Sequence, residues 1–266
     1  MLYRLLFALF LPIVGALAPL NAIAESGRIG IVLMHGKGGT PTKHISDLAG
    51  PLEQQGYLVA NLEMPWSGRR NYDVPVKAAE AEIEAALGSL RSKGAQKVFV
   101  AGLSQGGLFA LHFGTGHAVD GIIAITPGGS VGSNIFREKL GESVESARKL
   151  VAEGKGEETA RLFDFESSKG IYPIVTRPSV YLTWFDPEGA MNQAKAAQAM
   201  NPAIPVLFIV PTRDYPGLLK IKQKMFDALP KNPRTKLYEP DATHLGSPAA
   251  SIKEIIDWTS AVANAR

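Results

Sequence analysis

The sequence predicts an α/β fold in which a doubly wound, mostly parallel sheet of about six strands carries helices on both faces. Short apolar, β-branched runs alternate with longer amphipathic segments, and this alternation is typical of a parallel sheet covered on both sides. The strand-like runs are almost continuously apolar, as expected for strands buried on both faces. One stretch of about 70 residues breaks the alternation, and its length predicts an insertion instead of an ordinary connection.

The first half of the alternation ends at Thr126. Residues 28–34 (RIGIVLM) are a β-branched run before a glycine-rich turn, which predicts a buried strand. A helix over 74–90 is predicted because its apolar residues recur with helical spacing on one face. The same patterns predict strands at 57–62, 97–101 and 121–126, and helices at 43–55 and 105–113.

The stretch over 128–200 is polar and mostly helix-like, with a strand-like piece at 179–184. We expect it to form a helical cap over one end of the sheet. The alternation then resumes with residues 206–210 (VLFIV), another buried strand. It continues with a helix at 218–229, a strand at 235–239 and a final helix at 249–263.

Composition narrows the class of protein. The chain has 266 residues, 45% of them hydrophobic, which suits a single globular domain. It has no cysteine, so a thiol nucleophile, a cysteine zinc site and an iron–sulfur cluster are excluded. The formal net charge is +3 without a dense Lys/Arg run, so we expect no nucleic-acid partner.

The first 24 residues differ from the rest and predict a secretory signal peptide. Arg4 is their one charged residue, an apolar run covers 5–20, and small residues at 22 and 24 mark a cleavage site. The alternative, an uncleaved membrane anchor, is disfavoured because the run is shorter than the ~20 residues of a spanning helix. We therefore expect an exported protein, periplasmic or secreted, whose mature domain covers 25–266 and has no stable membrane anchor.

The strongest motif is Gly102-Leu103-Ser104-Gln105-Gly106, directly after a predicted strand and before a predicted helix. A serine in the pattern G-x-S-x-G stands on a sharp turn that exposes its hydroxyl. Side chains at 102 and 106 would crowd that turn, so glycine is needed there. Ser104 is therefore the candidate nucleophile.

A second motif, His35-Gly36-Lys37-Gly38-Gly39, follows the first predicted strand. A tetrahedral intermediate needs backbone N–H donors for its oxyanion, one from the residue after the nucleophile and one from an earlier loop. Gln105 and Lys37 are the candidates. The competing interpretation, a phosphate-binding loop, lacks both of its glycine patterns. We expect the Lys37 side chain to be solvated.

A serine needs a base, and a base needs a carboxylate to orient it. His244 lies in a loop before the last predicted helix, and Asp214 lies just beyond the strand at 206–210. Asp186 and Asp241 are alternative carboxylates. Of the other four histidines, His35 belongs to the glycine-rich loop. We expect His44, His112 and His117 to be packing or surface residues.

Taken together, the two glycine-rich motifs and the late Asp and His resemble the α/β-hydrolase superfamily over residues 27–266. Almost nothing precedes the first strand of the mature chain, as in the compact dienelactone-hydrolase-like members. The resemblance implies a triad of Ser104, Asp214 and His244 that hydrolyses a small-molecule carboxylic ester, without a metal or organic cofactor. A thioesterase or acyltransferase on the same triad, or a non-catalytic envelope binding protein, is the alternative.

Three further residues are candidates for binding substrate. Trp66 and Arg69 lie in the loop after the second predicted strand, at the sheet edge where ligands bind in open α/β folds. Trp184 lies within the predicted cap and could line an acyl pocket. For Trp66 and Arg69, the alternative is a packed indole and a solvated guanidinium.

Overall fold

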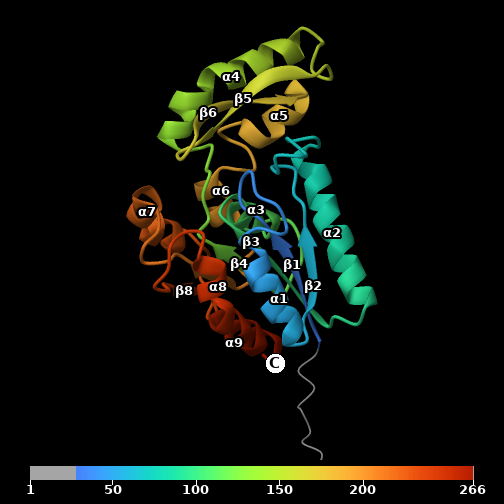
Figure 1. The fold of residues 1–266 in the computed structure, drawn as a ribbon, viewed down its shortest axis with the longest axis vertical. Coiled ribbons are helices and arrows are strands. Elements are labelled where there is room, and N and C mark those ends of the chain that lie inside the picture. The colour runs from blue at the N-terminus through green and yellow to red at the C-terminus, as the bar shows by residue number, and fades with distance from the viewer. Residues whose placement is uncertain (1–27, 266) are drawn as a thin grey trace, which may run out of the picture.

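The computed structural model describes residues 28–265, in which a central sheet is covered by helices and carries a cap beyond one end (Figure 1). The predicted signal peptide at 1–24 lies outside the described residues. Within residues 28–265, no helix is long and apolar enough to cross a membrane.

The central sheet has six strands in the order β2-β1-β3-β4-β7-β8, and every neighbouring pair is parallel. This confirms the predicted parallel sheet of about six strands. The strands are β1 (Ile29–Met34), β2 (Leu58–Leu62), β3 (Lys97–Leu103), β4 (Gly121–Ile125), β7 (Val206–Ile209) and β8 (Lys236–Tyr238).

Helices cover both faces of this sheet because its strands are apolar on both sides (Figure 1). Along β1, Ile31 and Leu33 belong to one core, whereas Val32 belongs to the core on the opposite face. The predicted last helix is divided in two at Ser251. The helices outside the cap are α1 (Ser46–Gln54), α2 (Val76–Ser92), α3 (Gln105–Phe113), α7 (Pro216–Asp227), α8 (Ser247–Ala250) and α9 (Ile252–Ala263).

Five elements lie between β4 and β7, and most of them form the cap (Figure 1). They are α4 (Asn134–Ala152), β5 (Ala160–Glu166), β6 (Gly170–Thr176), α5 (Pro178–Phe185) and α6 (Gln193–Ala199). The prediction of a helical cap is incomplete, because β5 and β6 pair as an antiparallel hairpin. The strand predicted at 179–184 is wrong: this run is the helix α5, which Pro178 begins with its fixed φ.

Candidate active site

Ser104 stands on a strained turn between β3 and α3. Its backbone has φ 56° and ψ −113°, a conformation that non-glycine residues rarely adopt. The turn is also crowded: a Cβ on Gly102 would lie 2.2 Å from the carbonyl of Gly106, so no side chain fits there. This strained turn between a strand and a helix has the backbone geometry that a nucleophile elbow requires.

The glycine-rich loop after β1 runs against this elbow. A Cβ on Gly36 would lie 3.4 Å from the Cβ of Ser104. The loop is fixed from within by His35, whose Nδ1–H donates to the Gly36 carbonyl at 2.7 Å and whose Nε2 accepts from the Met64 N–H at 3.0 Å. Burial lowers the pKa of His35, so this neutral histidine is a structural residue.

The two predicted oxyanion donors lie on these adjoining segments. Gln105 directly follows Ser104, and Lys37 directly follows Gly36. In residues 28–265, neither backbone N–H has a backbone acceptor, so both are free to bind an oxyanion. The expectation of a solvated Lys37 side chain is wrong, because this side chain is only 10% exposed and its ammonium forms an ion pair with Asp164 at 2.5 Å.

His244 and Asp214 are brought together from the loops after β8 and β7. His244 Nδ1 and Asp214 Oδ1 are 2.7 Å apart, and each residue is only 6% exposed. The alternative carboxylates form ion pairs elsewhere, Asp186 with Arg148 and Asp241 with an exposed arginine. Asp214 is therefore the carboxylate that orients the His244 ring.

Thr126 is a site residue that the sequence analysis missed. Its Oγ1 lies 3.5 Å from His244 Nε2, the ring nitrogen that does not face Asp214. Its backbone has φ 45°, an outlier for a β-branched residue. The preceding Ile125 carbonyl accepts the Ser104 N–H at 2.8 Å, so this turn connects Ser104 with His244.

Ser104 and His244 themselves share no hydrogen bond in the part of the chain that the structure describes. Such catalytic bonds are often long in ligand-free structures and tighten when substrate binds. The hydrogen bond to Asp214 fixes the tautomer of His244. Its Nδ1–H donates to the Asp214 carboxylate, so Nε2 keeps the lone pair that a base needs.

Apolar side chains flank the same histidine. The Tyr215 ring stacks on His244, with centroids 4.5 Å apart, and Tyr215 is 51% exposed. The adjacent Leu245 is 44% exposed. An exposed aromatic ring thus lies directly against the buried His244–Asp214 pair.

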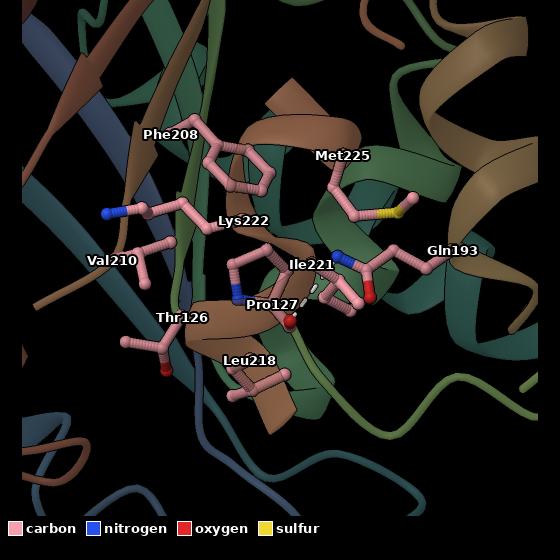
Figure 2. Close-up of a pocket in the computed structure, with 9 residues that line it drawn as sticks. All are labelled: Thr126, Pro127, Gln193, Phe208, Val210, Leu218, Ile221, Lys222 and Met225. Carbon is pink, nitrogen blue, oxygen red and sulfur yellow. Dashed lines mark hydrogen bonds between the residues drawn. The ribbon is translucent and has the colours of Figure 1, made fainter. Parts of the chain in front are cut away.

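A small pocket lies behind Thr126, between the sheet and α7 (Figure 2). Its volume is about 10 Å³, about what one water molecule needs and far below the roughly 300 Å³ at which small-molecule sites begin. Gln193 reaches it with an Oε1 that has no partner in the described residues. The pocket therefore adjoins the site but is too small for a drug-sized ligand.

The predicted substrate-binding residues are placed differently from expectation. Trp66 and Trp184 are buried and pack edge to face, with ring centroids 5.8 Å apart. Their indole N–H groups donate to the carbonyls of His35 and Val74. These are the contacts of core side chains rather than of a substrate wall, because a buried, hydrogen-bonded indole offers no surface to a ligand.

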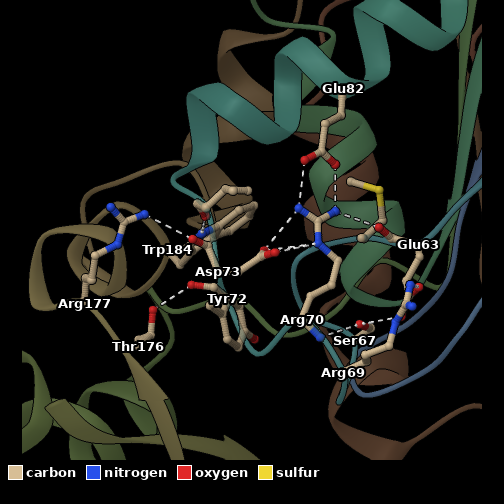
Figure 3. Close-up of polar contacts among 12 residues, drawn as sticks. Glu63, Ser67, Arg69, Arg70, Tyr72, Asp73, Glu82, Thr176, Arg177 and Trp184 are labelled. Atoms are coloured by element: carbon tan, nitrogen blue, oxygen red, sulfur yellow. Dashed lines mark hydrogen bonds and ion pairs between the residues drawn. The ribbon is translucent and has the colours of Figure 1, made fainter. Parts of the chain in front are cut away.

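Arg69 lies at the surface, where it pairs with Glu63 (Figure 3). The neighbouring Arg70 binds both carboxylate oxygens of Glu82 at 2.7 Å and also reaches Asp73. The arginine pair thus meets carboxylates of the protein itself, which stiffen the loop after β2.

The same loop is bonded to the cap. Thr176 Oγ1 donates to the Tyr72 carbonyl at 2.6 Å, and the Trp184 indole donates to the Val74 carbonyl at 2.8 Å (Figure 3). Asn71 donates to a carbonyl of β6. The loop after β2 is therefore the joint between cap and sheet.

Among residues 28–265, no group of three or more His, Asp or Glu side chains is placed to hold a metal ion. The chemistry available to the described site is that of a serine, a histidine–carboxylate pair and backbone donors.

Comparison with known proteins shows the class of fold. The structure is similar to the α/β-hydrolase GrgF from Penicillium sp. sh18, with a TM-score of 0.65, 16% identity and 90% of each chain covered. It is similar to a thermostable carboxyl esterase from Bacillus coagulans, with a TM-score of 0.61, 14% identity and 90% of each chain covered. It is also similar to a monoacylglycerol lipase from Paleococcus ferrophilus, with a TM-score of 0.58, 20% identity and coverage of 88% of this chain and 94% of that one.

These similarities establish that the chain has the α/β-hydrolase fold. No protein-family model matches the sequence, and no curated protein sequence matches it. Fold alone does not determine activity, which depends on the residues of the site.

Proposed function

We propose that this protein is a serine hydrolase that cleaves a carboxylic ester through an acyl-enzyme intermediate. The observation that carries the proposal is the buried 2.7 Å hydrogen bond between His244 and Asp214 beside the strained turn of Ser104. These residues follow β8, β7 and β3. They share one edge of the sheet because the carboxyl ends of parallel strands lie together.

The proposed reaction has two halves. Ser104 Oγ attacks the ester carbonyl while His244 Nε2 takes its proton, and His244 then gives that proton to the leaving alcohol. Asp214 keeps the imidazole in the tautomer with a free Nε2 and stabilises its charged form. Water then attacks the acyl-enzyme by the same route and releases the acid.

Backbone donors stabilise the charge that develops on the carbonyl oxygen. The N–H groups of Lys37 and Gln105 lie on segments in close contact around Ser104. Such donors act without reorganising, and the loss of one typically costs about 100- to 1000-fold in kcat.

Two observations favour an ester with an apolar portion. Tyr215, which follows Asp214 in the sequence, exposes an aromatic ring that stacks on His244, and Leu245, which follows His244, exposes an apolar side chain. Two structural neighbours are a carboxyl esterase and a monoacylglycerol lipase, so the fold carries ester chemistry in other proteins.

The test is turnover of p-nitrophenyl esters from acetyl to palmitoyl by purified protein, beside Ser104→Ala. The proposal expects turnover and fluorophosphonate labelling in the wild type and neither in Ser104→Ala. Ser168→Ala is the matched control, because Ser168 is exposed in the cap turn and should keep both. A folded wild type that neither turns over an ester nor reacts with fluorophosphonate would contradict the proposal.

We also propose that the protein is exported and cleaved after Ala24. The support is the sequence pattern of residues 1–24. N-terminal sequencing of protein from the cell envelope and medium should begin at Glu25. A start at Met1 would contradict cleavage.

A further inference from the structure

The cap strand β5 holds a buried carboxylate that the proposed reaction does not use. The Asp164 side chain is fully buried and accepts four hydrogen bonds. Its Oδ1 accepts from Lys37 Nζ at 2.5 Å and from the Phe165 N–H at 2.6 Å. Its Oδ2 accepts from the hydroxyls of Tyr72 and Tyr172, each at 2.9 Å. A buried charge with every lone pair engaged is held in one position.

Two of these donors lead to the candidate oxyanion hole. Lys37 supplies one of its backbone N–H groups. The Tyr72 hydroxyl accepts a hydrogen bond from Gln105 Nε2 at 3.2 Å, and Gln105 supplies the other backbone N–H. One carboxylate of the cap therefore restrains the side chains of both residues whose backbones would bind the oxyanion.

In the series of hydrogen bonds from Asp164 through Tyr72 to Gln105, each donor and each acceptor is fixed. Tyr72 has one proton, which it gives to Asp164, so its lone pair is left for the Gln105 amide. Burial and the charge of Asp164 raise the pKa of Tyr72, which keeps the hydroxyl protonated. The Gln105 amide can thus bond to Tyr72 only through its Nε2.

The backbone of Tyr72 adds an independent observation. Its φ is 56°, which is an outlier for a bulky residue. Such strain persists where the surroundings determine the conformation and is concentrated at functional sites. Here the Thr176 hydroxyl holds the Tyr72 carbonyl at 2.6 Å from the cap side.

We propose that Asp164 is a positioning residue, which uses Lys37 and the Tyr72–Gln105 pair to hold the two sides of the oxyanion hole from the cap. The inference rests on the proposed function. It makes the cap hairpin part of the active site, because the cap would determine how well the oxyanion is bound in addition to covering the site.

Replacing Asp164 directly leaves the Lys37 ammonium buried without a counter-charge, which tests stability as much as catalysis. The sharper variant is Tyr72→Phe, which releases the Gln105 amide and keeps the ion pair. We expect kcat on the best p-nitrophenyl ester to fall about tenfold with KM changed less than about twofold, since the lost positioning acts on the transition state. Inhibition by an alkyl boronic acid, which forms a tetrahedral serine adduct, should weaken by the same factor of about ten.

Tyr172→Phe is the matched control. It removes a hydroxyl at the same 2.9 Å from the same Asp164 oxygen, but no hydrogen bond links that hydroxyl to Gln105 in the described residues. Its kcat should stay within about threefold of wild type. Gln105→Met, which keeps the backbone N–H, should lose the same factor as Tyr72→Phe, and the double variant should lose no more than either single variant.

Equal losses in Tyr72→Phe and Tyr172→Phe, or a Tyr72→Phe enzyme with unchanged kcat and boronic acid inhibition, would overturn the inference. A loss confined to melting temperature would also overturn it, because a purely structural role moves stability alone. If the wild type lacks turnover and fluorophosphonate labelling, the proposed function fails and the inference falls with it. An active wild type with an equally active Tyr72→Phe variant refutes the inference alone.

Discussion

The elbow and the loop after β1 approach so closely at Gly106 that one methyl group should separate them. A Cβ on Gly106 would lie 2.6 Å from the Met34 carbonyl oxygen and 2.8 Å from that of His35. Ordinary contact begins at about 3.4 Å. The first contact is therefore short by 3.4 − 2.6 = 0.8 Å, and both obstructing atoms belong to the backbone, which cannot rotate away. In Gly106→Ala, the elbow and the loop after β1 must move apart.

The magnitude follows from that displacement. A misplacement of about 1 Å can cost about 100-fold in rate, and the loss of an oxyanion donor costs about 100- to 1000-fold. We expect kcat of Gly106→Ala on p-nitrophenyl esters to fall about 100-fold. We expect the free energy of unfolding in urea to fall by about 1–3 kcal/mol, the usual cost of overpacking.

Gly88→Ala is the matched control. Gly88 lies within α2 with open space where a Cβ would be. Alanine there should raise the free energy of unfolding by about 0.5–1 kcal/mol through helix propensity and leave kcat unchanged. A Gly106→Ala enzyme with kcat within twofold of wild type would refute the argument that the two segments need this backbone contact.

Three other changes test separate parts of the structure. Asp214→Asn should lower kcat by about 10,000-fold in steady-state assays while circular dichroism stays unchanged, because the amide favours the wrong tautomer of His244. The pKa of His35 is lowered from 6.5 by burial, so the unfolded chain binds its proton first as the pH falls. The free energy of unfolding should therefore decline below about pH 6.5, by at most about 1.4 kcal/mol per pH unit. Urea unfolding at several pH values should show this decline in the wild type and a shallower one in His35→Gln. Ser133→Ala removes the N-cap of α4, whose side chain accepts the Phe136 N–H. The loss should cost about 1 kcal/mol of stability and so lower the melting temperature. An unchanged melting temperature would contradict that role.

The parallel sheet could be predicted from sequence because its strands are buried on both faces. A run such as VLFIV has few alternatives to a buried strand, and the elbow motif carries its own requirement for glycine. The pairing of His244 with Asp214 was predictable for a similar reason. Both residues lie in loops that follow strands of one parallel sheet, so topology brings them to the same edge.

The cap could not be predicted in the same way. The strand β5 buries a charged residue, Asp164, and the strand β6 exposes an apolar one, Val175. Alternation of apolar and polar residues is therefore weak there. The burial of Trp66 and Trp184 and the ion pair of Lys37 with Asp164 likewise depend on contacts between cap and sheet, which sequence spacing does not encode.

The strained residues of the chain connect these observations. Among residues 28–265, five non-glycine residues have positive φ, and three of them, Tyr72, Ser104 and Thr126, surround the candidate site and its cap joint. Each costs about 1–3 kcal/mol and persists only if its surroundings hold it. The holding contacts are distinct: Thr176 for Tyr72, the Ile125 carbonyl for Ser104, and a strand hydrogen bond for Thr126. Since these contacts come from the cap, β4 and β7, the site geometry depends on the whole assembled fold. A change that loosens the cap should therefore reduce turnover before it unfolds the sheet.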